Sequence, residues 1–158
     1  MHVTKHRHED AIAAGEKAIA LDPNDELAYS NLADTLHFAG RGEEALGLIQ
    51  KAMRLDPHYP AFRLHVLASV YWSLGRYEEA IATQKRQLAR TPDQLFAYIS
   101  LASLYSLLGH EVEARAAGAE VRRLNPAFSL ELASKSWPYK DPQDLDRIVT
   151  ALRKAGLK

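Results

Sequence analysis

A glycine followed five residues later by an alanine recurs along this chain and strongly constrains its fold. Segments with helical apolar periodicity lie on both sides of each glycine. Glycine accepts the left-handed backbone that commonly ends a helix, and a small alanine lets two helices pack closely. Each pair therefore predicts two helices joined by a tight turn. The pairs are Gly40 and Ala45, Gly75 and Ala80, and Gly109 and Ala114.

Prolines follow these helix pairs at a nearly constant period. Pro23, Pro57, Pro92 and Pro126 are separated by 34, 35 and 34 residues. A period of about 34 residues, with two helices in each period, is the spacing of the tetratricopeptide repeat. The chain is therefore expected to stack helical hairpins one after another.

The chain resembles the tetratricopeptide repeat (TPR) family at the positions that define its helix pairs. The resemblance implies an all-α fold, a right-handed solenoid of antiparallel helix pairs. The first complete unit carries Tyr29, Leu32, Ala33, Leu36, Gly40, Ala45, Ile49, Ala52 and Pro57. The second carries Leu64, Leu67, Ala68, Tyr71, Gly75, Tyr77, Ala80 and Pro92. The third carries Tyr98, Leu101, Ala102, Tyr105, Gly109, Ala114 and Pro126.

We expect TPR repeats over residues 1–126 and a C-terminal helical cap over residues 129–158. The repeats are a half repeat at 1–25 and full repeats at 26–59, 61–94 and 95–128. Some positions depart from the family pattern. Gly42 and Glu111, for example, replace the aromatic residue seen at Tyr77, and we expect looser packing around them.

The composition excludes several classes of partner. Twenty Lys and Arg residues balance twenty Asp and Glu residues, so no long-range field attracts nucleic acid or an anionic membrane. The chain has no cysteine, which excludes disulfides, thiolate catalysis and zinc–thiolate sites and favours the cytoplasm. The basic start precedes Glu9 and Asp10 rather than a hydrophobic stretch, so no signal peptide is predicted. No apolar run is long enough to span a bilayer.

The segment before Pro23 matches only the second helix of a repeat. Its apolar residues recur at intervals of three and four and form one face of a helix whose usual partner is missing. Three explanations are open: the chain is a piece of a longer protein, a second copy covers this face in a homodimer, or the terminus is frayed and partly exposed. The residues of this self-association face are Ala11, Ile12, Gly15, Ala18 and Ile19.

The repeat pattern stops after Pro126. Ser129 is expected to cap a short helix. Asp141 is expected to cap a final helix that has Pro142 at its first position and ends at Gly156. This tail is predicted to form a lid over the last repeat.

The tail also resembles the end of the TPR regions of bacterial class III adenylate cyclases and winged-helix regulators. The matching segments are 128–131, 138–142 and 152–157. This resemblance implies an alternative function, the regulatory or docking part of a bacterial multidomain signalling protein.

In the TPR family the first helix of each pair lines a concave surface on which a peptide ligand lies. The resemblance suggests that Asn31 bonds the main chain of a peptide, since its amide offers both donors and an acceptor. The lysines and arginines with which co-chaperone members hold a terminal carboxylate are absent, which disfavours chaperone tails as ligands. The residues that the resemblance places on this surface are Ser30, Asn31, Asp34, His37, Phe38, Phe62, His65, Ser69, Trp72, Phe96, Ile99 and Ser103.

Aromatic and hydroxyl side chains dominate this predicted groove, so we expect an apolar or amphipathic segment as the ligand. Aromatic anchors often carry most of the binding energy of an interface. We expect Trp72 to be exposed, because its neighbour Tyr71 already takes the core position. For Phe62 and Phe96, packing between repeats explains the residue as well as ligand binding does.

No set of residues predicts catalysis. His2, His6 and His8 offer imidazole ligands, but no carboxylate or fourth histidine stands at a fixed spacing from them, so we predict no metal site and no cofactor. His37 and His65 have no nucleophile or substrate group as an evident partner, and no phosphate-binding loop or nucleophile elbow is present. The leading hypothesis is a non-enzymatic protein–protein interaction scaffold that binds a peptide or a partner helix in its groove.

Overall fold

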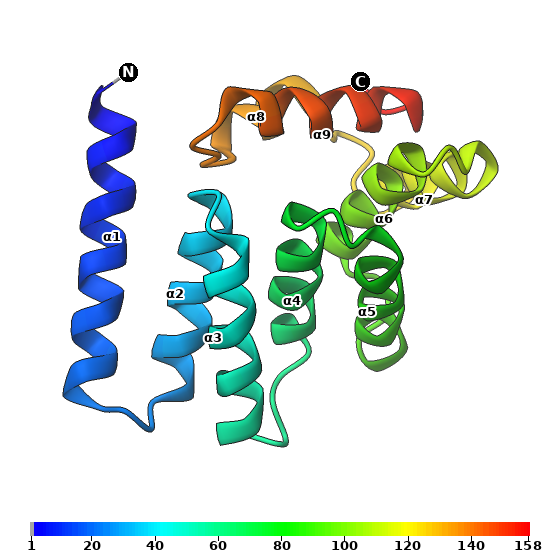
Figure 1. Ribbon diagram of the computed structural model, residues 1–158. Helices are drawn as coiled ribbons and strands as arrows, with labels where there is room; N and C mark the ends of the chain where they lie inside the picture. The colour runs from blue at the N-terminus through cyan, green and yellow to red at the C-terminus, as the bar shows by residue number, and fades with distance from the viewer. Residues whose placement is uncertain (1) are drawn as a thin grey trace.

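The computed structural model describes the backbone of residues 2–158 and the side chains from residue 7 onward. These residues form nine α-helices and no strand. The helices are α1 (His2–Leu21), α2 (Glu26–Phe38), α3 (Gly42–Leu55), α4 (Phe62–Ser73), α5 (Tyr77–Arg90), α6 (Leu95–Leu107), α7 (Glu111–Leu124), α8 (Leu130–Ser136) and α9 (Pro142–Lys154). In Figure 1, α2 to α7 form antiparallel pairs stacked side by side, with α1 at one end. The predicted all-α solenoid is therefore confirmed.

Each helix pair turns at the glycine that the repeat pattern marks. Gly40, Gly75 and Gly109 have positive φ angles of 79°, 72° and 76°, a conformation that a Cβ atom disfavours. At the first turn, which follows α2, the N–H of Arg41 donates to the carbonyl oxygen of Leu36 at 2.9 Å. The corresponding hydrogen bond recurs at the other two turns. These bonds satisfy carbonyl groups that a helix end otherwise leaves without partners.

Small residues let neighbouring helices pack closely. Ala33, Ala45, Ala68 and Ala80 are fully buried, so the helix backbones approach each other at these positions. Larger apolar side chains surround them in two clusters, one from α1 to α4 and one from α4 to the C-terminal helices. Tyr71 packs against both clusters, so the core is continuous along the stack, as in a solenoid.

The expectation of looser packing at Gly42 was wrong. Gly42 begins α3 and is buried. A Cβ atom placed on it would lie 2.8 Å from Oγ of Ser73 and 2.9 Å from Cδ2 of Leu74. The missing aromatic side chain is thus replaced by a closer approach of α3 to the end of α4. At the matching position of the last pair, Glu111 is exposed at the start of α7.

The apolar face of α1 is covered in part by α2, although the repeat pattern left this face without its usual partner. Ile12 is 4% exposed, and a Cβ atom on Gly15 would lie 2.9 Å from Cδ1 of Leu32 in α2. The physical reason is that the face packs against the first helix of the following pair. Of the other residues predicted for this face, Ala18 and Ile19 are half-buried and Ala11 is exposed.

The C-terminal helices begin where the capping residues predict. The Ser129 and Asp141 side chains accept hydrogen bonds from backbone N–H groups in the first turns of α8 and α9. Helix α9 packs on α6 and α7, so it covers the last repeat as expected. Nη1 of Arg122, in α7, donates to the carbonyl oxygen of Gly156 at 2.8 Å and holds the end of α9 in place.

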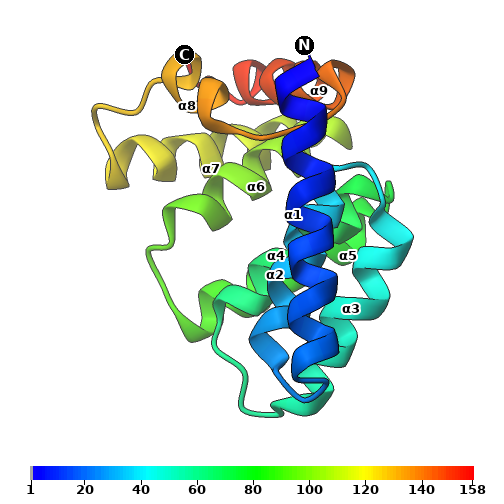
Figure 2. The ribbon, with the colours of Figure 1, turned by 90° about the vertical axis from the view of Figure 1, so that its left-hand side faces the viewer.

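The connector between α8 and α9, residues 137–141, extends to the first helices of the chain, which the sequence did not predict. Nε2 of His8, in α1, donates to the carbonyl oxygen of Pro138 at 2.7 Å. The N–H of Lys140 donates to the carbonyl oxygen of Phe38, at the end of α2, at 3.0 Å. Figure 1 shows α8 and α9 lying across the ends of the stacked pairs, and Figure 2 shows the connector, in orange, beside the N-terminal half of α1. The tail therefore joins the last repeat to the first.

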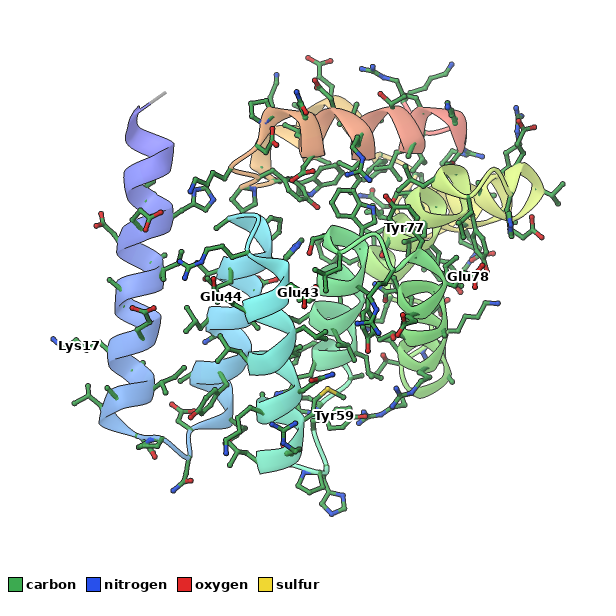
Figure 3. All side chains as sticks on the ribbon, in the orientation of Figure 1. Lys17, Glu43, Glu44, Tyr59, Tyr77 and Glu78 are labelled. Atoms are coloured by element: carbon green, nitrogen blue, oxygen red, sulfur yellow. The ribbon has the colours of Figure 1, made fainter. Side chains whose placement is uncertain are left out.

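Two tyrosines in the middle of the stack, at opposite ends of its helices, link neighbouring elements (Figure 3). Tyr59 lies between α3 and α4, where its hydroxyl accepts from Arg86 at 3.0 Å and its carbonyl oxygen accepts from Arg90 at 2.7 Å. The hydroxyl of Tyr77, the first residue of α5, accepts a hydrogen bond from Arg147 of α9. These outer arginines are therefore engaged in contacts within the chain.

Candidate functional site

A cavity of about 380 Å³ lies on the concave side of the solenoid. Helices α2, α4 and α6 supply one wall, and the connector and α9 supply the other. Its volume is in the range of ligand-binding sites in proteins, about 300–1,000 Å³. The repeat pattern explains the first wall, because the first helix of every pair presents the same face to the concave side.

All twelve residues predicted for the groove line this one cavity. Helix α2 contributes Ser30, Asn31, Asp34, His37 and Phe38, helix α4 contributes Phe62, His65, Ser69 and Trp72, and helix α6 contributes Phe96, Ile99 and Ser103. The sequence thus predicted which side chains meet. That a ligand binds among them stays a prediction.

Sequence reasoning missed the residues that close the cavity from the tail. Trp137 and Tyr139 from the connector and Ile148 from α9 complete the lining. The Tyr139 ring lies 4.9 Å from the Phe38 ring and 5.8 Å from the Trp72 ring, centroid to centroid. The aromatic residues on either side of Pro138 could have suggested a contact with the groove. Whether they touch it, however, depends on the path of the connector, which the repeat pattern does not specify.

The aromatic side chain that was expected to be exposed is buried, and the two for which packing was an equal alternative are exposed. Trp72 is only 4% exposed, so the prediction that it would be exposed was wrong. The reason is that Tyr139 covers it on one side and the guanidinium of Arg147 lies 5.3 Å from its ring centroid. Phe62 and Phe96, by contrast, are 45% and 60% exposed, which leaves them available at the surface of the cavity.

Asp34 is the one carboxylate in the lining that the structure describes. Burial raises the pKa of its carboxyl group to about 6, from an ordinary value of 3.8, because a charged carboxylate is poorly solvated there. No residue with a described side chain forms an ion pair or hydrogen bond with this group. The carboxylate therefore faces the cavity without a counter-ion among the side chains from residue 7 onward.

The two histidines of the lining are neutral near pH 7. Burial, and to a smaller degree the neighbouring His65, lowers the pKa of His37 to about 3. Burial also lowers the pKa of His65, whose Nδ1 accepts a hydrogen bond from Nε2 of Gln84 at 3.1 Å. Neither imidazole supplies positive charge to the cavity at neutral pH.

Several buried polar atoms at the cavity lack hydrogen-bond partners within the described part of the chain. These atoms are Oγ of Ser30, Nδ1 of His37 and Nε1 of Trp72. Buried polar groups are usually paired, so such atoms are candidates for bonds to a ligand or to water. Asn31, predicted to bond a peptide main chain, is exposed at the cavity.

The structure offers no metal site among the side chains that it describes. Three or more His, Asp or Glu side chains do not come together in a metal-binding arrangement anywhere from residue 7 onward. Of the three N-terminal histidines, the side chains of His2 and His6 lie outside the described residues. His8 bonds the carbonyl oxygen of Pro138.

No helix in the described part of the chain has the length and apolar character needed to cross a membrane.

Comparisons with known proteins agree with the fold. The Tetratricopeptide repeat family matches residues 25–91. A solved structure of a thermophilic TPR protein from Thermus thermophilus is 26% identical, with a TM-score of 0.68 over 96% of this chain and 76% of that chain. The TPR repeat-containing protein YpiA of Bacillus subtilis is 26% identical over 145 residues, 92% of this chain and 34% of that protein.

A shorter match is to a putative adenylate cyclase. Putative adenylate cyclase 3 of Rhizobium meliloti is 46% identical over 44 residues, which is 28% of this chain and 8% of that protein. This chain spans between 7% and 34% of the length of the curated relatives that it matches here.

The stacked helix pairs and their concave cavity define a helical-repeat protein of the kind that serves as an interaction scaffold. With the signature residues and the matches above, the chain belongs to the tetratricopeptide repeat family.

Proposed function

We propose that this chain is a non-enzymatic scaffold that binds a short apolar or amphipathic peptide segment in its concave cavity. The observation that carries the proposal is the convergence of all twelve predicted groove residues on one cavity of about 380 Å³. Most of its lining is apolar or aromatic, and three buried polar atoms lack partners within the described chain. Such a combination suits a ligand that buries apolar side chains and offers main-chain hydrogen bonds.

The exposed aromatic residues support the cavity as the contact surface. Phe62 and Phe96 lie on neighbouring first helices and are 45% and 60% exposed. Exposed aromatic residues beside a cavity commonly anchor a partner, since each buries a large apolar area on binding. The connector occupies the side of the cavity near Phe38, which favours a short segment over a long partner helix.

A direct binding experiment tests the proposal. A displayed library of random twelve-residue peptides is selected on the immobilised chain, and the best peptide is titrated against wild type by fluorescence anisotropy. Phe96→Ala is expected to weaken binding roughly tenfold, because truncation of an aromatic anchor costs about 1–2 kcal/mol or more. Val112→Ala is the matched control, since Val112 is 79% exposed on the outer helix α7.

The outcomes separate the cavity from other surfaces. Loss of affinity in Phe96→Ala and Phe62→Ala, with Val112→Ala unchanged, supports binding in the cavity. Peptides that bind both cavity variants as tightly as wild type place recognition elsewhere and reject the proposal.

A second candidate function is an interaction region of a bacterial signalling protein. The 44-residue match to Putative adenylate cyclase 3 of Rhizobium meliloti favours it. An upstream reading frame that continues into this chain and encodes a cyclase or DNA-binding domain would support this role, and a stop codon directly upstream would reject it.

Homodimerisation through α1 has less support, because Ile12 is buried against α2. The lack of cysteine is consistent with a cytoplasmic location.

A further inference from the structure

Asp34 is the feature of the cavity that the proposed function leaves unused. It lies in the middle of α2, and its carboxylate is the single acidic group of the described lining. No described side chain pairs with it. A partly buried carboxylate without a counter-ion is a cost to the folded protein, because the low-dielectric surroundings solvate its charge poorly.

The other titratable groups near Asp34 do not neutralise it. His37 and His65 are held neutral by burial. Burial also raises the pKa of the Tyr139 hydroxyl, which keeps it uncharged. On α9, the guanidinium of Arg147 lies 3.6 Å from the carboxylate of Asp144. In the connector, the ammonium of Lys140 lies 3.5 Å from the carboxylate of Glu9 in α1. Both cations therefore have other carboxylates as partners.

The aromatic lining suits a cation as well as an apolar group. Arg147 already places its guanidinium 5.3 Å from the centroid of the Trp72 ring, and such contacts attract positive charge to the face of a ring. The aliphatic stem of a lysine or arginine can also lie along Phe38 and Phe62 while its head reaches a carboxylate.

We infer that the peptide bound in this cavity carries a lysine or arginine side chain whose cationic head pairs with the carboxylate of Asp34. This inference rests on the proposed function and specifies its ligand, an apolar segment with one basic residue. The inference rests on charge complementarity, since the described lining of the cavity presents one unpaired negative charge among mainly apolar side chains. A charge-assisted hydrogen bond in such surroundings contributes roughly ten- to a hundredfold in affinity.

The first arm of the test compares selections on three proteins. The random peptide library is panned on wild type, on Asp34→Asn and on Asp10→Asn. Asp10→Asn removes the same charge from an exposed position of α1 outside the cavity. Wild type and Asp10→Asn are expected to enrich lysine or arginine at one common position beside apolar residues. Asp34→Asn is expected to select apolar peptides without that enrichment.

The second arm measures the pair itself. A selected peptide and its copy with norleucine in place of the basic residue are titrated against wild type and Asp34→Asn. Either single change is expected to weaken binding at least tenfold, and both together no further, because each removes the same interaction. The norleucine peptide tests the pair on wild-type protein, so the result does not depend on the folding of a variant.

The pH dependence gives an independent readout. Between pH 7.5 and pH 5, protonation of the Asp34 carboxyl should weaken binding of the basic peptide to wild type, since its pKa is about 6. His37 stays neutral over this interval, and the Asp34→Asn variant should show a flatter profile.

The outcomes distinguish this inference from the proposed function. Peptides that lose affinity in Phe96→Ala, yet lack a basic residue and bind Asp34→Asn as tightly as wild type, overturn the inference and leave the cavity as the binding site. Peptides that bind Phe96→Ala and Phe62→Ala like wild type overturn both.

Discussion

The backbone N–H of Lys140 donates to the carbonyl oxygen of Phe38 at 3.0 Å and ties the C-terminal tail to the second helix. That carbonyl belongs to the last turn of α2, where the helix itself offers no donor. Beside it, His8 bonds the carbonyl oxygen of Pro138, across 130 positions of sequence. The first and last parts of the solenoid are therefore joined, and the cavity is closed on that side.

Tyr139→Ala should loosen this junction. The substitution removes the ring that contacts Phe38 and Trp72, and loss of a partly buried aromatic ring costs about 1–3 kcal/mol. Exchange of the Lys140 amide hydrogen is expected to speed up at least tenfold, measured by hydrogen exchange. Tyr139→Phe is the control, because it keeps the ring. Equal exchange in Tyr139→Ala and wild type would show that the hydrogen bonds hold the connector without the ring.

Gly118→Ala should separate α9 from α7. A Cβ atom at Gly118 would lie 2.4 Å from the carbonyl oxygen of Ala155, a backbone atom that moves only with its helix. We expect a loss of about 1–3 kcal/mol in the free energy of unfolding, typical of overpacking. Gly47→Ala serves as the matched variant, since nothing lies within 4 Å of a Cβ atom at this position of α3. It should stabilise by about 0.5–1 kcal/mol. Urea unfolding of both variants measures the difference, and equal effects would contradict the close contact.

Asp34→Asn should stabilise the protein at neutral pH and not in acid. The folded-state pKa of Asp34 is raised to about 6 from 3.8, so the folded state binds the proton more tightly than the unfolded state. Raising the pH through this interval therefore lowers the free energy of unfolding of wild type. The variant lacks this loss, and it should be more stable by about 1–3 kcal/mol at pH 7.5 but not at pH 3.5. Denaturant titrations at both pH values test this, with Asp10→Asn as the control.

His37 should make the protein sensitive to acid. Its folded-state pKa is lowered to about 3 from 6.5, so the unfolded state takes up the proton first as the pH falls. Stability is therefore complete above pH 6.5 and is lost between pH 6.5 and pH 3. Between pH 7.5 and 4.5, wild type should lose about 2–3 kcal/mol more than His37→Gln in the free energy of unfolding, measured by denaturant titration.

Two neighbouring groups must be considered in that comparison. His65 acts in the same direction because burial lowers its pKa also, whereas Asp34 acts in the opposite direction. Both are present in wild type and in His37→Gln, so the difference between the two proteins reports His37. His58→Gln, the same substitution at an exposed position, is the control. A similar profile for His37→Gln and wild type would show that His37 does not cause the acid sensitivity.

The helices, their turns and the face of each first helix that lines the cavity follow from local sequence. These features repeat with the chain and depend on neighbouring residues, such as Gly75 at a turn with positive φ and Ser129 at a cap. Because every repeat places its first helix in the same way, the groove residues from Ser30 to Ser103 were predictable as one set.

The segments that cover those residues depend instead on tertiary contacts. The connector has no repeat to follow, and its path depends on contacts with α1 and α2 that are remote in sequence. Its Tyr139 buries Trp72, which the local pattern placed at the surface. Packing on α2 likewise covers Ile12, which looked bare when α1 was considered alone. Periodicity assigns a side chain to a face, but burial depends on which distant segment packs against that face.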